Sequence, residues 1–425
     1  MTNRQFFQKI RILDPLSNID RVGDVLLDKG IITEISDHET SQKDDILGNH
    51  EEIEIINGKG LILAPALVDL YSRSSEPGYE ERETLKSLME ASQAGGFSRL
   101  GILPNTKPVI DNPSIVAWIK EKTALSKTKL YIWGGLTQNL EGVTIAELAD
   151  LAQSGVIGFT DNCPHSNLQL VRKLLEYAQP FNLPVALVPT NLQLHGNGVV
   201  RESSTSIRLG LVGNPEIAET VAIASLLEIV YLTKTPIHLM RISTARGVEL
   251  IKRAKENNLP VTASVNWHHL LLNTEMTATY NPNLRFEPPL GREIDRIALI
   301  QGVKDNIIDA IAIDHTPYTY EEKTVAFAQA PTGAIGLELA LPLLWQNLVT
   351  TGELSALELW CSLSVSPLQC LNQEPIKLQV GQPVELTLFS PQQSWKVTSS
   401  QLKSLSFNTY WLDQEIMGKI TALIH

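Results

Sequence analysis

Two carboxylates and two arginines occupy positions where their side chains could take part in chemistry. Asp161 and Asp314 each come at the end of an apolar, strand-like run, and Arg73 and Arg241 follow comparable runs. Such a carboxylate pair could act as general acid and base without a metal. Neighbouring arginines would lower the pKa values of both acids and keep both ionised, which suits a structural network better.

The segment between residues 61 and 365 supplies the elements that must position these side chains. Apolar strand-like runs alternate there with helical segments such as 171–178, 217–232 and 247–256, the pattern of parallel β/α units. The candidate strands are 61–64, 98–102, 130–133, 156–160, 185–188, 237–240, 261–265 and 307–313. Eight strands predict a closed (β/α)8 TIM-like barrel, whose site lies at the carboxyl ends of the strands.

Both ends of the chain have a different, purely β-type pattern. Short apolar runs at 10–13, 24–27 and 31–35 are separated by turn residues, and a similar run returns at 384–389. An isolated pair of strands could not stabilise itself, so we expect the tail to join the amino-terminal sheet. The prediction is a composite β-sandwich domain from residues 1–60 and 370–425, with the barrel over 61–369.

Composition and charge exclude several classes of protein. Hydrophobic residues make up 43% and charged residues 19%, as in ordinary globular proteins. The net charge of −12 argues against a nucleic-acid partner and an anionic membrane surface, and no apolar run is long enough to span a membrane. The three cysteines form no C-x-x-C pair, so neither a disulfide framework nor a thiolate zinc site is indicated. A cytoplasmic location is expected.

Eleven local motifs occur in an order similar to that of bacterial dihydroorotases, which are members of the amidohydrolase superfamily. They lie at residues 61–70, 76–78, 95–97, 103–106, 159–161, 238–244, 261–263, 268–270, 288–290, 314–317 and 336–338. The resemblance covers almost the whole chain and implies the barrel with its β-sandwich. It determines the fold far better than the activity.

The first metal-binding motif of that family is Asp-x-His-x-His-x-Arg-Glu-Pro-Gly, which aligns with residues 69–78. Tyr71 and Arg73 stand at the two histidine positions, and Ser75 replaces the arginine expected to pair with the substrate carboxylate. Residues 71 and 73 share one face of an alternating strand, so no single shift of register restores the site.

The later ligand positions follow the same trend. Val188 and Arg241 stand where the resemblance implies two further histidines, while Asp161 and Asp314 match a metal-bridging and a proton-shuttling aspartate. Zinc catalysis needs about three protein ligands and an open position. A guanidinium has no lone pair, so Arg73 and Arg241 are expected to pair with Asp161 or Asp314 in place of a metal. No metal or other cofactor is expected.

The substrate pocket implied by the resemblance is half retained at best. Asn105 and His315 match family positions, Ser75 does not, and Tyr318 stands where the second histidine of Asp-His-Ala-Pro-His would lie.

Other histidines and one cysteine leave alternatives open. A new metal site could draw on four histidines, although the alternative is buried imidazoles hydrogen-bonded to neighbouring strands; these are His238, His268, His269 and His315. The histidines expected at the surface are His38, His50, His165, His195 and His425. Cys163 is interpreted as a small loop residue and not as a nucleophile, because no activating histidine is evident.

Three functions remain as hypotheses. The first is a catalytically inactive, dihydroorotase-like protein of pyrimidine biosynthesis, a homodimer that serves as a noncatalytic partner, with aspartate carbamoyltransferase as the candidate. The second is an active cyclic amidohydrolase that uses zinc to convert dihydroorotate to N-carbamoyl-aspartate and loses turnover in Asp314→Ala. The third is a metal-free sensor that holds an anionic small molecule with Asn105, Arg73 and Arg241.

Overall fold

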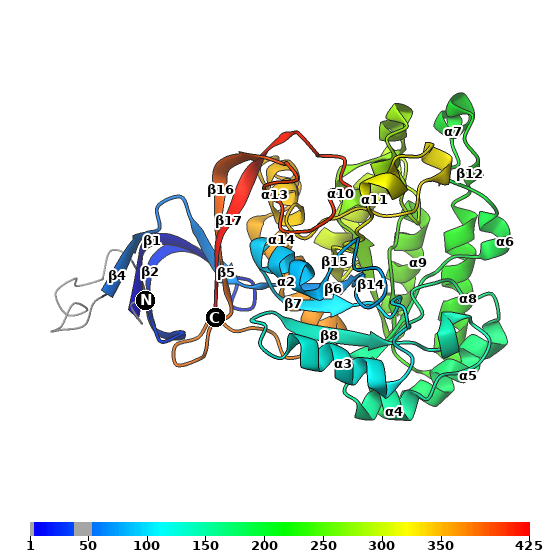
Figure 1. The fold of residues 1–425 in the computed structure, drawn as a ribbon, viewed down its shortest axis with the longest axis horizontal. Helices are drawn as coiled ribbons and strands as arrows, with labels where there is room; N and C mark the ends of the chain where they lie inside the picture. Colours follow the sequence, from blue (N-terminus) through cyan, green and yellow to red (C-terminus); the bar gives the residue numbers. More distant parts are fainter. Residues whose placement is uncertain (1–3, 38–52) are drawn as a thin grey trace.

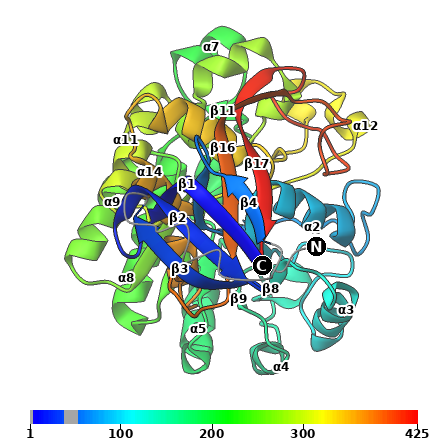
Figure 2. The ribbon, with the colours of Figure 1, turned by 90° about the vertical axis from the view of Figure 1, so that its left-hand side faces the viewer.

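The computed structural model describes residues 4–37 and 53–425, which form a β-sheet module and a barrel (Figure 1). Strands from both ends of the chain build the module at the left of Figure 1, and the barrel with its helices fills the rest. Figure 2 looks onto the module, with β1, β2 and β3 in front of the barrel. Among the described residues, no helix is long and apolar enough to cross a membrane.

The module is a seven-stranded sheet in the order β17-β16-β5-β1-β2-β3, with β4 paired to β1. Its strands are β1 (Arg4–Asp14), β2 (Ile19–Asp28), β3 (Ile31–Asp37), β4 (Ile53–Asn57), β5 (Ile62–Pro65), β16 (Leu386–Lys396) and β17 (Glu415–Ile424). One face is apolar and packs Phe7, Ile10, Leu27 and Leu388 into a common core. The prediction that the tail joins the amino-terminal sheet is confirmed.

The barrel has eight parallel strands in the order β15-β14-β13-β10-β9-β8-β7-β6. They are β6 (Leu67–Ser72), β7 (Phe97–Ile102), β8 (Lys129–Gly134), β9 (Gly158–Phe159), β10 (Val185–Leu187), β13 (Ile237–Leu239), β14 (Val261–Asn266) and β15 (Ala310–Ala312). The outer helices are α2 (Leu85–Ala94), α3 (Pro113–Thr123), α4 (Leu148–Gln153), α5 (Leu168–Ala178), α8 (Ile217–Thr233), α9 (Ala245–Glu256), α11 (Glu293–Lys304) and α14 (Ala356–Leu363).

Backbone hydrogen bonds beyond the ends of β6 and β15 close the ring. The N–H of Asp314 donates to the carbonyl of Tyr71 at 3.1 Å, and the N–H of Arg73 donates to the carbonyl of His315 at 2.8 Å. The first and last strands therefore bring Tyr71, Arg73 and Asp314 together at the carboxyl-terminal mouth of the barrel.

One predicted barrel strand is wrong. Residues 61–64 fall on β5, which pairs with β1 and β16 in the module, and the first barrel strand is β6. Both strands are buried and almost continuously apolar, so side-chain periodicity cannot separate them.

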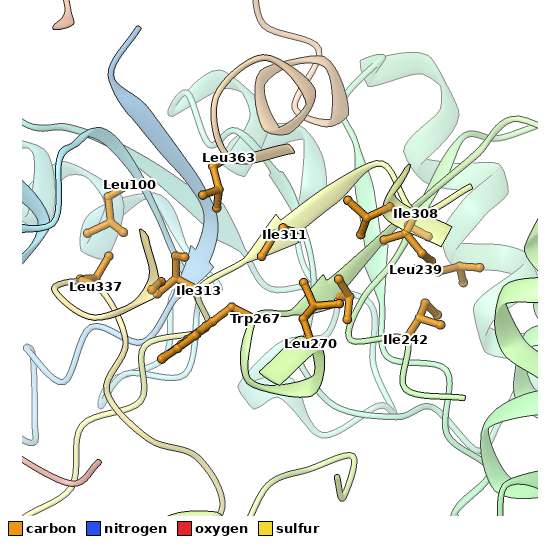
Figure 3. Close-up of a cluster of buried hydrophobic side chains, with 14 of the residues drawn as sticks. Leu100, Leu239, Ile242, Trp267, Leu270, Ile308, Ile311, Ile313, Leu337 and Leu363 are labelled. Atoms are coloured by element: carbon orange, nitrogen blue, oxygen red, sulfur yellow. The ribbon is translucent and has the colours of Figure 1, made fainter. Parts of the chain in front are cut away.

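Two apolar layers hold the barrel. Inside the ring, Tyr71, Trp133, Val188 and Met240 belong to one buried cluster. Outside it, strand residues such as Ile311 and Ile313 pack against other buried side chains, part of which Figure 3 shows. Because side chains fill the interior of the barrel, a polar site can form only at the ends of its strands.

Candidate functional site

A buried ion pair joins the ends of β13 and β15. Arg241 Nε donates to Asp314 Oδ2 and Arg241 Nη2 donates to Asp314 Oδ1, both at 2.7 Å. Asn266, at the end of β14, donates to Asp314 Oδ2 at 3.1 Å. The side chains of the pair are only 7% and 10% exposed. Both carboxylate oxygens are therefore occupied by donors from the protein itself.

The backbone at both positions turns sharply as the strands end. Arg241 has φ 55° and Asp314 has φ 50°, in the left-handed region. Aspartate tolerates this conformation better than a long side chain such as arginine does. The strained backbone at Arg241 is held by the bidentate pair and by packing.

Tyr71, at the end of β6, lies beside this pair. Its hydroxyl is 2.7 Å from Ser264 Oγ and accepts the N–H of Arg241 at 3.3 Å. Ser264 Oγ is in turn 2.8 Å from Nε2 of His238, whose Nδ1 is 2.9 Å from Thr262 Oγ1. Burial lowers the pKa of His238 to about 3, so this imidazole is neutral.

The ionisation states of Arg241 and Tyr71 follow from burial and from the charges next to them. Burial lowers the pKa of Arg241, but the charge and the hydrogen bonds of Asp314 outweigh that effect and raise it above its ordinary value. Burial raises the pKa of Tyr71 against the opposing charge of Arg241. The guanidinium stays charged and the phenol stays protonated at any physiological pH.

Asp161 does not join this pair. Its Oδ1 accepts the N–H groups of Leu136 at 2.7 Å and Thr137 at 2.9 Å, and its Oδ2 accepts the Thr137 hydroxyl. The expected pairing with an arginine is wrong for Asp161, because the loop after β8 already supplies well-placed donors to this short side chain.

Arg73 also departs from the expected network. Its Nη1 donates to Tyr318 Oη at 3.4 Å, and within the described residues it makes no ion pair. Its Nε is buried without a hydrogen-bond partner in that same part of the chain. Only one of the two predicted arginine–carboxylate pairs is therefore confirmed.

The remaining pocket positions are dispersed around the mouth. Asn105 donates to the carbonyl of Asp161 at 3.4 Å and accepts from Asn162 at 2.7 Å. Ser75 is buried, and its carbonyl accepts the N–H of Tyr79. Val188 is buried in the apolar cluster inside the barrel. These side chains pack or bond with protein groups.

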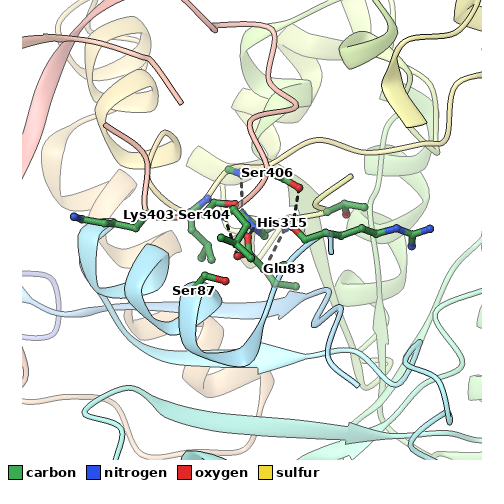
Figure 4. Close-up of polar contacts among 12 residues, drawn as sticks. Glu83, Ser87, His315, Lys403, Ser404 and Ser406 are labelled. Atoms are coloured by element: carbon green, nitrogen blue, oxygen red, sulfur yellow. Dashed lines mark hydrogen bonds and ion pairs between the residues drawn. The ribbon is translucent and has the colours of Figure 1, made fainter. Parts of the chain in front are cut away.

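His315 belongs to a polar cluster with Glu83 and Ser404 (Figure 4). Its Nδ1 accepts the N–H groups of Gly336 and Leu337, so Nε2 carries the proton and lies 3.3 Å from Glu83 Oε2. Glu83 also accepts from the Ser404 hydroxyl and from the N–H of Leu405 at 3.1 Å. This cluster anchors the carboxyl-terminal segment to the barrel, a structural task that the sequence did not suggest.

Three further histidines expected to be either ligands or buried residues are buried and hydrogen-bonded. His238 bonds to a neighbouring strand, as predicted, but His268 bonds to Asn266 and His269 to the carbonyl of Pro288. The described residues hold no group of three His, Cys, Asp or Glu side chains that could bind a metal ion.

Two histidines expected at the surface are not there. The His165 side chain is only 5% exposed, with Nε2 3.4 Å from Asp161 Oδ2, and His195 is partly buried beside Glu287. Both histidines lie in polar, loop-like segments of the sequence, and such segments give no sign that a side chain is buried. His425 is exposed, as predicted, whereas His38 and His50 lie outside the described residues.

Cys163 is a loop residue without an activating base. Burial, assisted by the charge of Asp161, raises its pKa to about 11. The thiol is therefore protonated at neutral pH and a poor nucleophile.

Comparison with known proteins decides the family. No protein-family model matches the chain. It is 42% identical to a "probable dihydroorotase-like protein" of Synechocystis sp., over 97% of this chain and 98% of that protein. It is also 35% identical to a dihydroorotase of Pelobacter propionicus, over 98% and 97% of the two chains. The chain belongs to the dihydroorotase family.

Solved structures agree on the fold of this dihydroorotase-like chain. An L-hydantoinase from Arthrobacter aurescens superimposes with a TM-score of 0.85 at 19% identity, covering 100% of this chain and 95% of that one. The dihydropyrimidinase from Brevibacillus agri gives a TM-score of 0.77 at 16% identity, over 99% and 93%. At these identities the likeness shows the fold, a TIM barrel with a β-sandwich.

The side chains at the mouth of this dihydroorotase-like barrel do not fit the zinc that the family motif implies. Arg241 occupies both oxygens of Asp314, and Asp161 accepts hydrogen bonds from Leu136 and Thr137 in the loop after β8. Tyr71 is a protonated phenol bonded to Ser264. A divalent cation would meet a fixed guanidinium charge and too few lone pairs.

Sequence reasoning missed two residues that support the pair, Asn266 and Ser264. Asn266 ends β14 in line with Asp314 at the end of β15, and Ser264 contacts Tyr71. The signal that could have found them is a polar side chain inside or directly after an apolar strand.

Proposed function

We propose that this dihydroorotase-like chain does not hydrolyse dihydroorotate and acts in pyrimidine biosynthesis as a noncatalytic partner. The observation that supports the proposal is the bidentate, buried pair of Arg241 and Asp314. We also propose a cytoplasmic location, which the three free cysteines support because disulfides are rare in a reducing compartment.

Hydrolysis of a cyclic amide requires an activated water and a group that can exchange a proton. Asp314 is at the position of the proton-shuttling aspartate, but Arg241 binds both of its oxygens. Both oxygens therefore face the guanidinium and not a substrate, and breaking the pair would leave the buried cation uncompensated. Among the residues that the structure describes, no group of three His, Cys, Asp or Glu side chains could hold a metal ion that generates hydroxide.

The experiment is a dihydroorotate hydrolysis assay on the purified chain, run in both directions, beside elemental analysis after incubation with zinc. Less than one equivalent of zinc and no turnover are expected. Turnover that disappears in Asp314→Ala would refute the proposal and establish an active cyclic amidohydrolase. Arg172→Ala, which alters an exposed ion pair far from the mouth, is a matched control for handling and folding.

The proposed partner is aspartate carbamoyltransferase. An intact barrel without catalytic ligands is most economically explained if the scaffold itself is used, and the transferase acts in the same pathway. Co-purification of the two proteins from cells, and a change in transferase activity when the chain is added, are expected. Separate elution and unchanged transferase activity would reject this partner while leaving the absence of hydrolysis intact.

A second candidate function, binding of an anionic small molecule, is favoured by unpaired donors. Arg73 and Arg285 each have a buried Nε with no hydrogen-bond partner in the described part of the chain. Calorimetric titration with dihydroorotate and N-carbamoyl-aspartate tests it. Binding that is lost in Arg73→Gln would support this function, and no heat with either compound would exclude these two ligands.

A further inference from the structure

Lys323 is a buried amine in the segment that follows the last barrel strand. It ends the short helix α12 (Tyr320–Lys323), labelled at the right of Figure 2, and is only 7% exposed. Its Nζ donates to the carbonyl of Pro331 at 2.7 Å and to the carbonyl of Pro282 at 3.2 Å. Lysine is rarely buried to this extent unless a carboxylate pairs with it. In the part of the chain that the structure describes, Lys323 makes no ion pair.

The hydrogen bonds of this amine suit its neutral form. A neutral amine has two N–H donors and one lone pair, whereas an ammonium group has three donors and no lone pair. The two carbonyls accept both N–H groups of the neutral form. The third donor of an ammonium group would have an aromatic ring as its neighbour, since the centre of the Tyr318 ring lies 5.2 Å from Nζ. The neutral form therefore keeps an unused lone pair, which makes a lysine amine a nucleophile.

The charged and titratable groups around Lys323 also favour the neutral form. Burial lowers the pKa of Lys323 to about 7, and the charge of Arg285 adds to this effect. Glu322 opposes it, but Arg82 already binds the Glu322 carboxylate at 2.6 Å. Burial also lowers the pKa of the neighbouring His268 well below its ordinary value, so that imidazole is neutral. Above about pH 7, more than half of the Lys323 amines therefore carry no charge.

A cavity gives small molecules access to this amine. Its volume is about 120 Å³, and apolar or aromatic side chains form much of its wall beside Lys323: Tyr318, Tyr320, Phe407 and Leu412. Tyr320 is 63% exposed and lies on the solvent side, with its ring centre 6.3 Å from that of Phe407. An engineered apolar cavity of about 150 Å³ binds benzene, so a molecule with one aromatic ring suits a space of this size.

We propose that Lys323 takes up a small aromatic aldehyde in this cavity by forming an imine. The lone pair of Nζ attacks the carbonyl carbon, and a C–N bond forms. The carbonyl oxygen leaves as water together with the two protons of the amine, so the step needs neither an oxidant nor a reductant. Addition of water to the imine restores the amine and the aldehyde. This inference does not rest on the function proposed above, because Arg241 and Asp314 take no part in it.

Trapping of the imine on the full chain tests the proposal. The protein is incubated with benzaldehyde and then treated briefly with borohydride, and peptide mapping by mass spectrometry measures the benzyl group on each lysine. At about pH 7, Lys323 is expected to carry at least about ten times the label of Lys252, which is exposed on α9. The label on Lys323 should fall at lower pH, because the amine becomes protonated. Equal labelling of Lys323 and Lys252 would overturn the proposal.

A matched pair of variants tests the part played by the cavity. Leu412→Trp narrows the cavity and is expected to reduce the benzaldehyde label on Lys323 to the level of Lys252, whereas the much smaller formaldehyde should still react. Leu405→Trp, at an exposed position of the same segment, should label like the wild type. Full benzaldehyde labelling in Leu412→Trp would overturn the proposal. A wild-type chain whose Lys323 reacts with formaldehyde but not with benzaldehyde would overturn it without any variant.

Discussion

Arg241 and Asp314 form a two-pronged ion pair at the mouth of the barrel, and each residue has a positive φ. Both positions would hold metal in an active member of the family, according to the motif resemblance. In this structure the guanidinium of Arg241 supplies the positive charge that faces Asp314. The acid remains compensated, but no open coordination position results.

Removing one member of this pair should destabilise the fold strongly. Arg241→Ala leaves a buried carboxylate uncompensated and is expected to lower the free energy of unfolding by about 3–5 kcal/mol. The double variant Arg241→Met with Asp314→Leu should lose much less, because it buries no charge. Urea denaturation measures both. Arg172→Ala, in a pair exposed to solvent, should cost less than about 1 kcal/mol. Equal losses in the single and double variants would contradict this account.

Tyr71→Phe should be destabilising although it changes one atom. The Ser264 hydroxyl and the N–H of Arg241 would lose their buried partner, at a cost of about 1–3 kcal/mol. Tyr320→Phe, at an exposed hydroxyl, is the matched control and should be neutral. Thermal unfolding followed by circular dichroism compares the two. The interpretation is wrong if Tyr71→Phe and Tyr320→Phe both have the melting temperature of the wild type.

Stability should depend on pH through Glu338. Burial raises the pKa of Glu338 to about 7, against the lowering effect of the Ser404 and Lys403 N–H groups. Between about pH 4.5 and 7 the folded chain keeps a proton that the unfolded chain has released. The free energy of unfolding should therefore fall as pH rises through this window, by up to about 3 kcal/mol, and level off above it.

The variant Glu338→Gln is neutral at every pH and should lose that part of the slope. Denaturant titrations at several pH values, compared with the exposed control Glu176→Gln, give the measurement. Identical slopes in Glu338→Gln and wild type would show that Glu338 does not titrate in this range.

Zinc and chelators should leave the melting temperature of the wild-type chain unchanged, because a guanidinium occupies the site. Restoring the family ligands with Tyr71→His, Arg73→His, Val188→His and Arg241→His together is expected to give a zinc-dependent rise. Adding Asp314→Ala to that variant should reduce the rise. Scanning fluorimetry with and without zinc tests this, and a zinc-dependent shift in the wild type would count against it.

The alternation of apolar runs and helical segments was sufficient to predict a barrel, and the β-type pattern at both ends was sufficient to predict a shared sheet. The assignment failed at residues 61–64, where β5 and β6 follow each other almost without a polar break. Which sheet a buried strand joins depends on its hydrogen-bonded neighbours, and those are distant in sequence. Strand pairing therefore cannot be predicted from the local pattern of apolar residues alone.

The residue types at the strand ends could be predicted from the amino-acid order alone, and they are Tyr71, Arg73, Asp161, Arg241 and Asp314. Only the tertiary structure decided their partners. Asp161 accepts hydrogen bonds from the N–H groups of Leu136 and Thr137. Arg73 donates to the hydroxyl of Tyr318, and Arg241 forms an ion pair with Asp314. The physical reason is that a buried polar group bonds to whichever donor or acceptor the fold brings within about 3 Å, and residue type alone does not specify that neighbour.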